Sequence, residues 1–251
     1  MSGFHAFWSL GVLAGSILTS LFLQWQISIL ANILIYIIIM LPINILFCFK
    51  LTEDTKSSDQ AIKNIFFIWP ILIFLLAIIA MANVLTEGSV DSWGALYMKD
   101  FVKVSGFQVG IATISFNIFM VLGRIYGDTF RDRLGVYILL LSLMFLTIIS
   151  LGILINFNTI LSSVLGFALL GLGTSSIVPM TYSLVSNIKG LDSRVGITII
   201  SISVYGTFIG APATLGLLAN SYGINNIFTP ILIIFILLLI LIRIFKDNFK
   251  L

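Results

Sequence analysis

Charged residues are scarce in this sequence. Only 9% of its 251 residues are Asp, Glu, Lys or Arg, whereas 59% are hydrophobic. A soluble domain carries about a quarter charged residues, so this composition excludes an ordinary water-soluble fold. The net charge of +3 comes from basic residues scattered over short connecting segments. They form no basic stripe of the kind that binds nucleic acid, so we expect no nucleic-acid partner.

Cysteine and histidine are almost absent, since Cys48 and His5 are the only ones. A single cysteine forms no intrachain disulfide and no cysteine-based zinc site. No Ser/His/Asp set, metal-ligand cluster or phosphate loop is recognisable, so we expect neither an enzyme nor a bound cofactor. No Lys or Arg precedes the first apolar segment, which therefore lacks the basic region of a signal peptide, and we expect it to remain as a helix.

Long apolar segments dominate the chain instead. About 20 apolar residues in a helix span the hydrocarbon core of a bilayer. The sequence contains about eight such segments and therefore predicts an all-α integral membrane protein that lies in the lipid bilayer. The predicted helices cover residues 4–22, 27–49, 65–89, 107–126, 136–155, 159–185, 196–219 and 227–245.

The basic residues indicate the orientation of these helices. Eleven of the thirteen Lys and Arg residues fall on one side when the predicted helices are threaded through a membrane, and only Lys99 and Lys103 fall on the other. Cytoplasmic connections carry the excess of Lys and Arg. We therefore expect a multi-pass protein of the cell membrane, either a plasma membrane or a bacterial inner membrane, with both termini cytoplasmic.

A sequence pattern that occurs twice indicates how the helices are grouped. Two Gly-x-x-x-Gly patterns, each followed by a Thr, recur at one offset of 195 residues (206 − 11): Gly11, Gly15 and Thr19, and Gly206, Gly210 and Thr214. We predict that residues 1–49 are the last two helices of an incomplete N-terminal bundle, 50–64 a cytoplasmic linker and 65–251 a six-helix bundle. Four helices would then be missing from the front. Coincidence is the alternative, because such spacings are common where membrane helices pack closely.

A glycine-rich motif lies at the expected cytoplasmic junction of the fourth and fifth predicted helices. Residues 123–135 read GRIYGDTFRDRLG, which resembles the G-x-x-x-D-R/K-x-G loop signature of the major facilitator superfamily (MFS). Asp128 can contact a helix N-terminus or Arg124 in one transport state and release it in the other, which would make it a gate latch. The alternative is that the basic residues only hold this connection on the cytoplasmic side of the membrane. The candidate gate residues are Gly123, Arg124, Gly127, Asp128, Arg131 and Arg133.

A second motif lies at the expected outer end of the third predicted helix. Residues 87–97 read EGSVDSWGALY and resemble the E-G-x-x-x-D-W-x-x-x-Y stretch of the fucose-permease-like branch of this superfamily, although Ser92 separates the Asp from the Trp. Asn83, Glu87 and Asp91 recur every four residues and so share one helix face. An acid in a membrane segment is costly enough to indicate a function. The alternative for Glu87 is a structural pair with a neighbouring helix.

Two further stretches resemble the same branch. Residues 171–179, GLGTSSIVP, are similar to its G-x-G…P segment, and residues 2–11, SGFHAFWSLG, are similar to the approach to its fifth helix. The resemblance covers nearly the whole chain. It implies helices five to twelve of a twelve-helix transporter, that is, one complete six-helix half and the last two helices of the other.

Two functions follow from these patterns. The first is a secondary active transporter (a symporter) of a small polar solute, such as a sugar, coupled to protons. The second is a truncated, non-transporting fragment or scaffold that binds other membrane proteins. A homodimer or the missing N-terminal half is the expected partner. The candidate residues for the solute or proton pathway are Asn83, Glu87, Asp91, Asn117, Tyr182 and Tyr205.

Overall fold

The computed structural model describes residues 2–49, 70–188 and 190–249, and these residues contain helices and no strand. The predicted linker 50–64 lies outside the described residues. The elements in chain order are α1 Ser2–Gln24, α2 Ile29–Cys48, α3 Ile71–Leu96, the π-helix η1 Tyr97–Phe101, the 3-10 helix η2 Gly106–Gly110, α4 Ile111–Leu134, α5 Val136–Asn156, α6 Ile160–Thr174, α7 Ile177–Val185, α8 Ser193–Tyr222, η3 Ile224–Ile227, α9 Phe228–Ile244 and η4 Lys246–Phe249.

The predicted all-α membrane class is confirmed. Within the described residues, eight helical spans are long and apolar enough to cross a membrane. Three predicted helices differ from the observed ones, and the first difference is that α4 ends at Leu134 rather than at residue 126. The segment 159–185 is interrupted at Ser175 and Ser176 and forms α6 and α7. The third predicted helix does not end at residue 89, because α3 and η1 form one span that reaches Phe101.

Local sequence explains where several helices begin and end. Gly135 follows α4 with φ 76° and Gly223 follows α8 with φ 91°, a backbone conformation that side chains with a Cβ rarely adopt. The side chain of Thr159 accepts a hydrogen bond from the Ser162 N–H and the Ser162 side chain caps the Thr159 N–H, so a capping box begins α6. Asp192 caps α8 through the N–H of Arg194.

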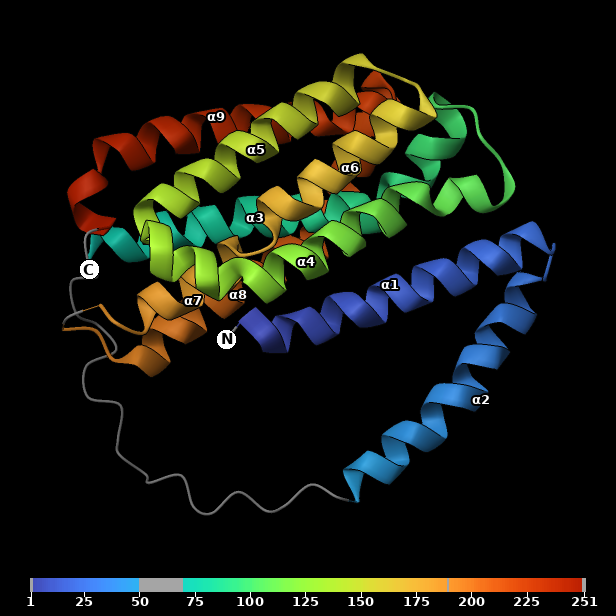
Figure 1. The fold of residues 1–251 in the computed structure, drawn as a ribbon, viewed down its shortest axis with the longest axis horizontal. Helices are drawn as coiled ribbons and strands as arrows, with labels where there is room; N and C mark the ends of the chain where they lie inside the picture. Colours follow the sequence, from blue (N-terminus) through green and yellow to red (C-terminus); the bar gives the residue numbers. More distant parts are fainter. Residues whose placement is uncertain (1, 50–69, 189, 250–251) are drawn as a thin grey trace.

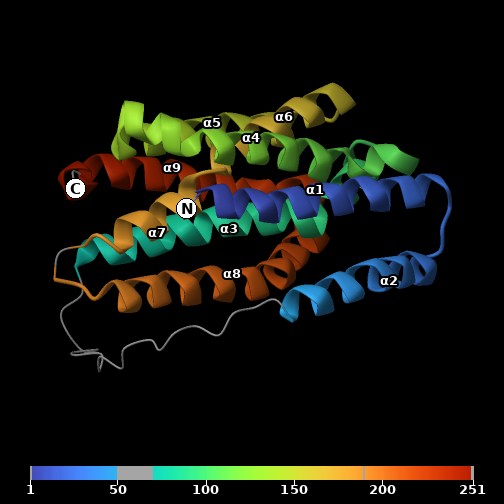
Figure 2. The ribbon, with the colours of Figure 1, turned by 60° about the horizontal axis from the view of Figure 1, so that its bottom comes forward.

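The helices of the main bundle and α1 run roughly along one common direction, whereas α2 is steeply inclined to them in the view of Figure 1. Helices α4, α5 and α6 form one layer, α3 and α9 lie beneath them, and α8 lies on the far side (Figure 2). The α4–α5 turn, the α7–α8 connection and the C-terminal end of α9 gather at one end, whereas the α1–α2 turn, the η1–η2 connection and the α5–α6 turn lie at the other (Figure 1). Connections that the sequence assigns to the same side of the membrane therefore lie at the same end of the molecule.

Aromatic side chains fill the bundle near the end that holds η1. Tyr97 is fully buried and contacts Phe167 and Phe228, with ring centroids 5.5 Å from its own in both cases. Its hydroxyl donates a hydrogen bond to the carbonyl oxygen of Leu154 at 2.7 Å. Its polar tip thus has a partner inside the protein, and the ring lies in the core rather than at a membrane interface.

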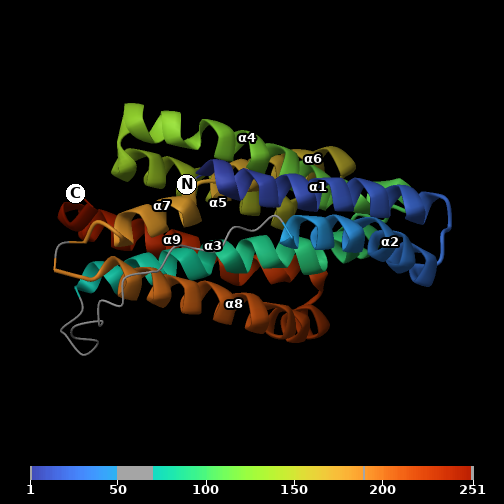
Figure 3. The same cartoon turned by 90° about the horizontal axis from the view of Figure 1, so that it is seen from below.

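Helices α1 and α2 lie outside the main bundle. Helix α1 packs along α4 (Figures 1 and 3). Helix α2 contains no buried residue. It is held to α1 by Tyr36, whose hydroxyl donates to the carbonyl oxygen of Gly15 at 2.9 Å. The two copies of the Gly-x-x-x-Gly pattern contain four glycines, which we call the repeat glycines: Gly11, Gly15, Gly206 and Gly210. A Cβ added at any of them would meet nothing within 4 Å, so they do not mediate close helix contacts within the described residues.

Candidate functional site

The predicted polar face of α3 lies deep in the membrane span. Asn83 is buried, and its Nδ2 donates to Oε1 of Glu87 at 2.8 Å. The predicted position of Glu87 near the end of its helix is wrong: the span runs from Ile71 to Phe101 and Glu87 lies close to its middle. At this depth a charged carboxylate needs a partner, because lipid cannot solvate it.

Arg124 on α4 is that partner. Its side chain is 3% exposed, and Nη2 lies 3.3 Å from Oε1 and 3.4 Å from Oε2 of Glu87. The predicted place of Arg124 in a cytoplasmic loop motif is wrong: α4 continues to Leu134, and the Arg124 side chain is buried inside the bundle. The two residues form a buried ion pair between neighbouring helices, which is the structural alternative that the sequence left open for Glu87.

A backbone carbonyl near a proline in α7 is the second partner of Arg124. Pro179 has no N–H, so the carbonyl of Ser175, four residues earlier, lacks the hydrogen bond that a regular helix would supply. Nε of Arg124 donates to this carbonyl oxygen at 3.1 Å. The hydroxyl of Ser176 in turn donates to the carbonyl oxygen of Gly123 at 3.2 Å. The interruption between α6 and α7 is therefore joined to α4 by two hydrogen bonds that run in opposite directions.

Helix α1 supplies a third partner. Ser9 is fully buried, and its hydroxyl oxygen accepts a hydrogen bond from Nη1 of Arg124. The guanidinium group thus contacts α1, α3 and the α6–α7 interruption at once. Sequence reasoning missed Ser9 and Ser175 as partners, although both lie in motifs that it singled out. No local pattern indicates that serines 166 residues apart (175 − 9) meet at one arginine.

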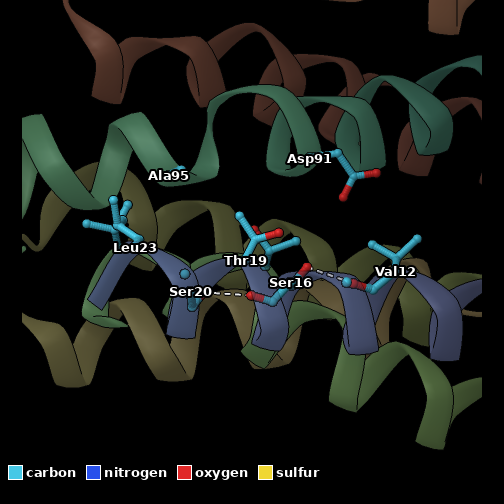
Figure 4. Close-up of a pocket in the computed structure, with 11 residues that line it drawn as sticks. Val12, Ser16, Thr19, Ser20, Leu23, Asp91 and Ala95 are labelled. Carbon is cyan, nitrogen blue, oxygen red and sulfur yellow. Dashed lines mark hydrogen bonds between the residues drawn. The ribbon is translucent and has the colours of Figure 1, made fainter. Parts of the chain in front are cut away.

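The remaining part of the polar face opens into a groove next to this cluster. The groove has a volume of about 450 Å³ and lies between α1, α3 and the η2–α4 junction. Asp91 reaches toward α1 across it, and Ser16, Thr19 and Ser20 line the opposite wall (Figure 4). Since Asp91 lies one helical turn after Glu87, the groove and the buried pair are adjacent sites on one helix face.

Three other predicted pathway residues do not join this cluster. Asn117 is buried, and its Nδ2 donates to the carbonyl oxygen of Thr113 at 2.9 Å on its own helix. The hydroxyl groups of Tyr182 and Ser201 lie 3.1 Å apart and connect α7 to α8. Tyr205 on α8 is 68% exposed.

The glycine-rich motif continues α4 as a helix rather than forming a loop. Asp128 pairs with Arg131 one turn later at 3.1 Å, and both side chains are partly exposed. Gly123 and Gly127 are buried. A Cβ at Gly123 would lie 2.2 Å from the Ser175 hydroxyl, so this glycine lets α4 approach the α6–α7 interruption. Arg133 is exposed near the helix end. Among the described residues, no three His, Cys, Asp or Glu side chains gather as metal ligands would.

The amino-acid sequence is similar to bacterial membrane proteins, although no family model matches it. It is 27% identical to an uncharacterized MFS-type transporter of Yersinia pestis over 88% of this chain and 57% of that protein. It is 24% identical to the membrane protein MosC of Rhizobium meliloti over 90% of this chain and 55% of that protein. An uncharacterized transporter of Sinorhizobium fredii is 25% identical, with 88% and 59% covered. The chain thus spans little more than half the length of these curated relatives.

Crystal structures of a peptide transporter, POT, share the fold. One complex, with alafosfalin, superposes with a TM-score of 0.64 at 18% identity over 73% of this chain and 40% of that one. The complex with sulfate gives 0.65 at 18% identity, with 73% and 39% covered. The relatives are named as transporters or membrane proteins and not as enzymes. Sequence and fold together support an MFS-like transporter.

Proposed function

We propose that this chain forms part of a secondary active transporter that moves a small polar solute, such as a sugar, together with protons by alternating access. The observation that carries the proposal is the buried pair of Glu87 and Arg124 near mid-depth in the membrane spans. A buried ion pair is weak evidence for stability, because hydrophobic side chains of similar volume stabilise at least as well. Ionisable residues at this depth usually serve a solute or proton pathway.

The contacts of Arg124 provide a mechanism for coupling. A proton on Glu87 removes one charge of the pair and weakens its hold on the guanidinium group. Arg124 is bonded at the same time to Ser9 on α1 and to Ser175 at the α6–α7 interruption. A change in its position therefore alters contacts between α1, α4 and α6. Protonation can shift the equilibrium between two arrangements only because it changes these contacts in one arrangement more than in the other.

Transport by this mechanism needs a second bundle. We propose that residues 65–251 form one complete six-helix half and that residues 1–49 belong to the other half. The exposed face of α2 and the open surfaces around the repeat glycines support this arrangement, because membrane helices use such glycines to pack closely against other helices. A longer polypeptide or a second copy would supply the remaining helices, so the chain is proposed here as a truncated form that does not transport alone. Both termini are proposed to be cytoplasmic in a cell membrane.

One observation favours a different function. Helix α2 has no buried residue among its 20 positions, so most of its surface outside the contact of Tyr36 with α1 is available to lipid or to another protein. A non-transporting fragment that binds other membrane proteins through α2 is therefore the second candidate. It needs no ionisable pair, and neutral replacement of Glu87 and Arg124 together would leave its binding unchanged.

Profiling of labelled metabolites tests the proposed transport without a known substrate. Cells in which the gene is deleted are compared with cells that carry the wild-type gene or the Glu87→Gln variant, after incubation with a polar-metabolite extract labelled with carbon-13. We expect one class of labelled solute to accumulate in wild-type cells and to be lost with a protonophore or in the variant. Identical labelled pools in deletion and wild-type cells would contradict transport and favour the scaffold.

A further inference from the structure

We infer that the groove between α1 and α3 binds the protonated amino group of the transported solute, which its carboxylate and hydroxyl oxygens would hold. The inference rests on the proposed transport function and narrows the substrate class to polar solutes that carry an ammonium group. Three observations support it: the direction of the hydrogen bonds in the wall, the charge left without a partner, and the size of the groove.

The hydroxyl protons of the α1 wall are already engaged with acceptors in the protein. Ser16 donates to the carbonyl oxygen of Val12 at 2.8 Å, and Ser20 donates to the carbonyl oxygen of Ser16 at 2.6 Å. A serine hydroxyl has one proton and two lone pairs. Both side chains therefore have only acceptor capacity left, and Figure 4 shows them on the stretch of α1 that faces Asp91.

The Thr19 hydroxyl proton is also engaged, as the hydrogen bonds of Tyr36 show. Its hydroxyl lies 3.0 Å from the hydroxyl of Tyr36. Tyr36 donates its only proton to the carbonyl oxygen of Gly15, so Thr19 must be the donor in the pair. The hydroxyl oxygens of Ser16, Thr19 and Ser20 thus offer hydrogen-bond acceptors and no donors. A ligand that sits against this wall has to bring the protons.

Asp91 adds a carboxylate that forms no ion pair in the described part of the chain, although the charge of Arg124 acts on it from a distance. Glu87, one turn earlier, is occupied by Arg124 and Asn83. No ion pair or hydrogen bond joins the Asp91 carboxylate to another described residue, and this carboxylate lies on the groove wall within a membrane span. An unpaired carboxylate is costly in that setting. A positively charged ligand removes this cost, whereas a neutral polyol does not.

The size of the groove selects an organic cation over a metal ion. Small-molecule sites occupy about 300 to 1,000 Å³, and the groove volume of about 450 Å³ falls in that range. A bare ion needs a close shell of six or more oxygens, or retains its water. One carboxylate and four hydroxyl groups, those of Ser16, Thr19, Ser20 and Thr113, are spread over three helices and form no such shell. An ammonium group needs only a few acceptors around it, and the rest of the groove can hold the body of the solute.

Equilibrium binding to the purified 251-residue chain in detergent tests the inference. The probes are two pairs that differ in the inferred determinant: D-glucosamine against D-glucose, which lacks the amino group, and ethanolamine against choline, whose ammonium has no N–H. We expect the chain to bind glucosamine at least tenfold more tightly than glucose and ethanolamine more tightly than choline. Equal binding within each pair, no measurable binding of any probe, or a response to sodium chloride alone would overturn the inference.

Matched variants distinguish a direct role of the carboxylate from a change in folding. Asp91→Asn keeps the shape and should abolish the preference for glucosamine over glucose, whereas Asp91→Glu should retain it. Asp100→Asn removes one exposed acid from η1 near the same end of the bundle and serves as the control, with the preference unchanged. Equal losses in both Asn variants would overturn the inference. If an Asn variant does not purify, the inference is still tested by the preference for glucosamine over glucose in the wild-type chain and in the Asp91→Glu variant.

Uptake separates failure of this inference from failure of the proposed function. If wild-type cells accumulate neutral solutes in the metabolite profile and the chain does not prefer glucosamine, transport stands and the ammonium site is wrong. If the chain prefers glucosamine and deletion cells have the same labelled pools as wild-type cells, the site stands and transport is wrong.

Discussion

Arg124 and Pro179 meet at a single backbone carbonyl. Because Pro179 cannot donate to the carbonyl oxygen of Ser175, that oxygen accepts a hydrogen bond from Nε of Arg124 at 3.1 Å. A proline that interrupts one helix thereby provides an acceptor for a buried arginine on another. The same arginine balances Glu87, so the helix interruption and the membrane-buried acid belong to one connected group.

Removing one member of the buried pair should be more harmful than removing both. Arg124→Met leaves the Glu87 carboxylate without its cation, and we expect the free energy of unfolding to fall by about 3 to 5 kcal/mol. The double variant Glu87→Gln with Arg124→Met leaves no charge and should recover a large part of this loss. Denaturant titration of the purified proteins measures both values. A double variant that is no more stable than Arg124→Met alone would contradict the pairing.

Two glycines on neighbouring helices should respond to alanine in opposite ways. A Cβ at Gly171 would lie 2.0 Å from the carbonyl oxygen of Phe116 on α4, whereas a Cβ at Gly152 on α5 would meet nothing within 4 Å. Gly171→Ala should destabilise by about 1 to 3 kcal/mol because backbone has to move. Gly152→Ala should be neutral or stabilise by up to about 1 kcal/mol through helix propensity. Thermal unfolding in one detergent compares them, and similar shifts would contradict the close α4–α6 contact.

The side of the membrane can be tested with two isosteric substitutions. Ser193 begins α8 and Ser105 precedes η2; both are exposed, and they lie at opposite ends of the bundle. In a Cys48→Ser background, we expect Ser193→Cys to react with an impermeant maleimide only when the cytoplasmic face is accessible and Ser105→Cys only from outside. The reverse pattern would overturn the predicted orientation.

Asp128 should matter more for transport than for stability. Its pair with Arg131 is within one helix and partly exposed, and such pairs contribute about 0.3 to 0.5 kcal/mol. We therefore expect Asp128→Asn to unfold like the wild type but to slow uptake of the solute found by metabolite profiling, if the residue acts as a latch in another state. Asp132→Asn, at a 69% exposed acid one turn later on the same helix, is the control. Equal uptake by all three proteins would contradict the latch.

The sequence predicted the membrane class and most helix boundaries, since length and apolar character fix both. Helix α5 begins at Val136 in both the prediction and the structure. The sequence also identified the polar face of Asn83, Glu87 and Asp91 from helical spacing. It could not place Arg124, because a positive charge near a glycine-rich motif looks like a loop anchor until the helix is known to continue past it. It could not identify Ser9 as a partner of Arg124, because contacts between helices far apart in the sequence depend on tertiary packing, which the periodicity of the sequence does not reveal.

Proton-driven accumulation in native membrane vesicles tests the central claim, that Glu87 couples the solute to protons, most directly. Vesicles with wild-type protein, Glu87→Gln or Glu87→Asp are loaded with buffer, and a pH gradient with an alkaline interior is imposed in the presence of the solute found by metabolite profiling. We expect wild-type and Glu87→Asp vesicles to accumulate the solute above its external concentration. Glu87→Gln should exchange internal for external solute without accumulating it, because its amide cannot take up and release a proton. Accumulation by Glu87→Gln equal to that of the wild type would contradict the account.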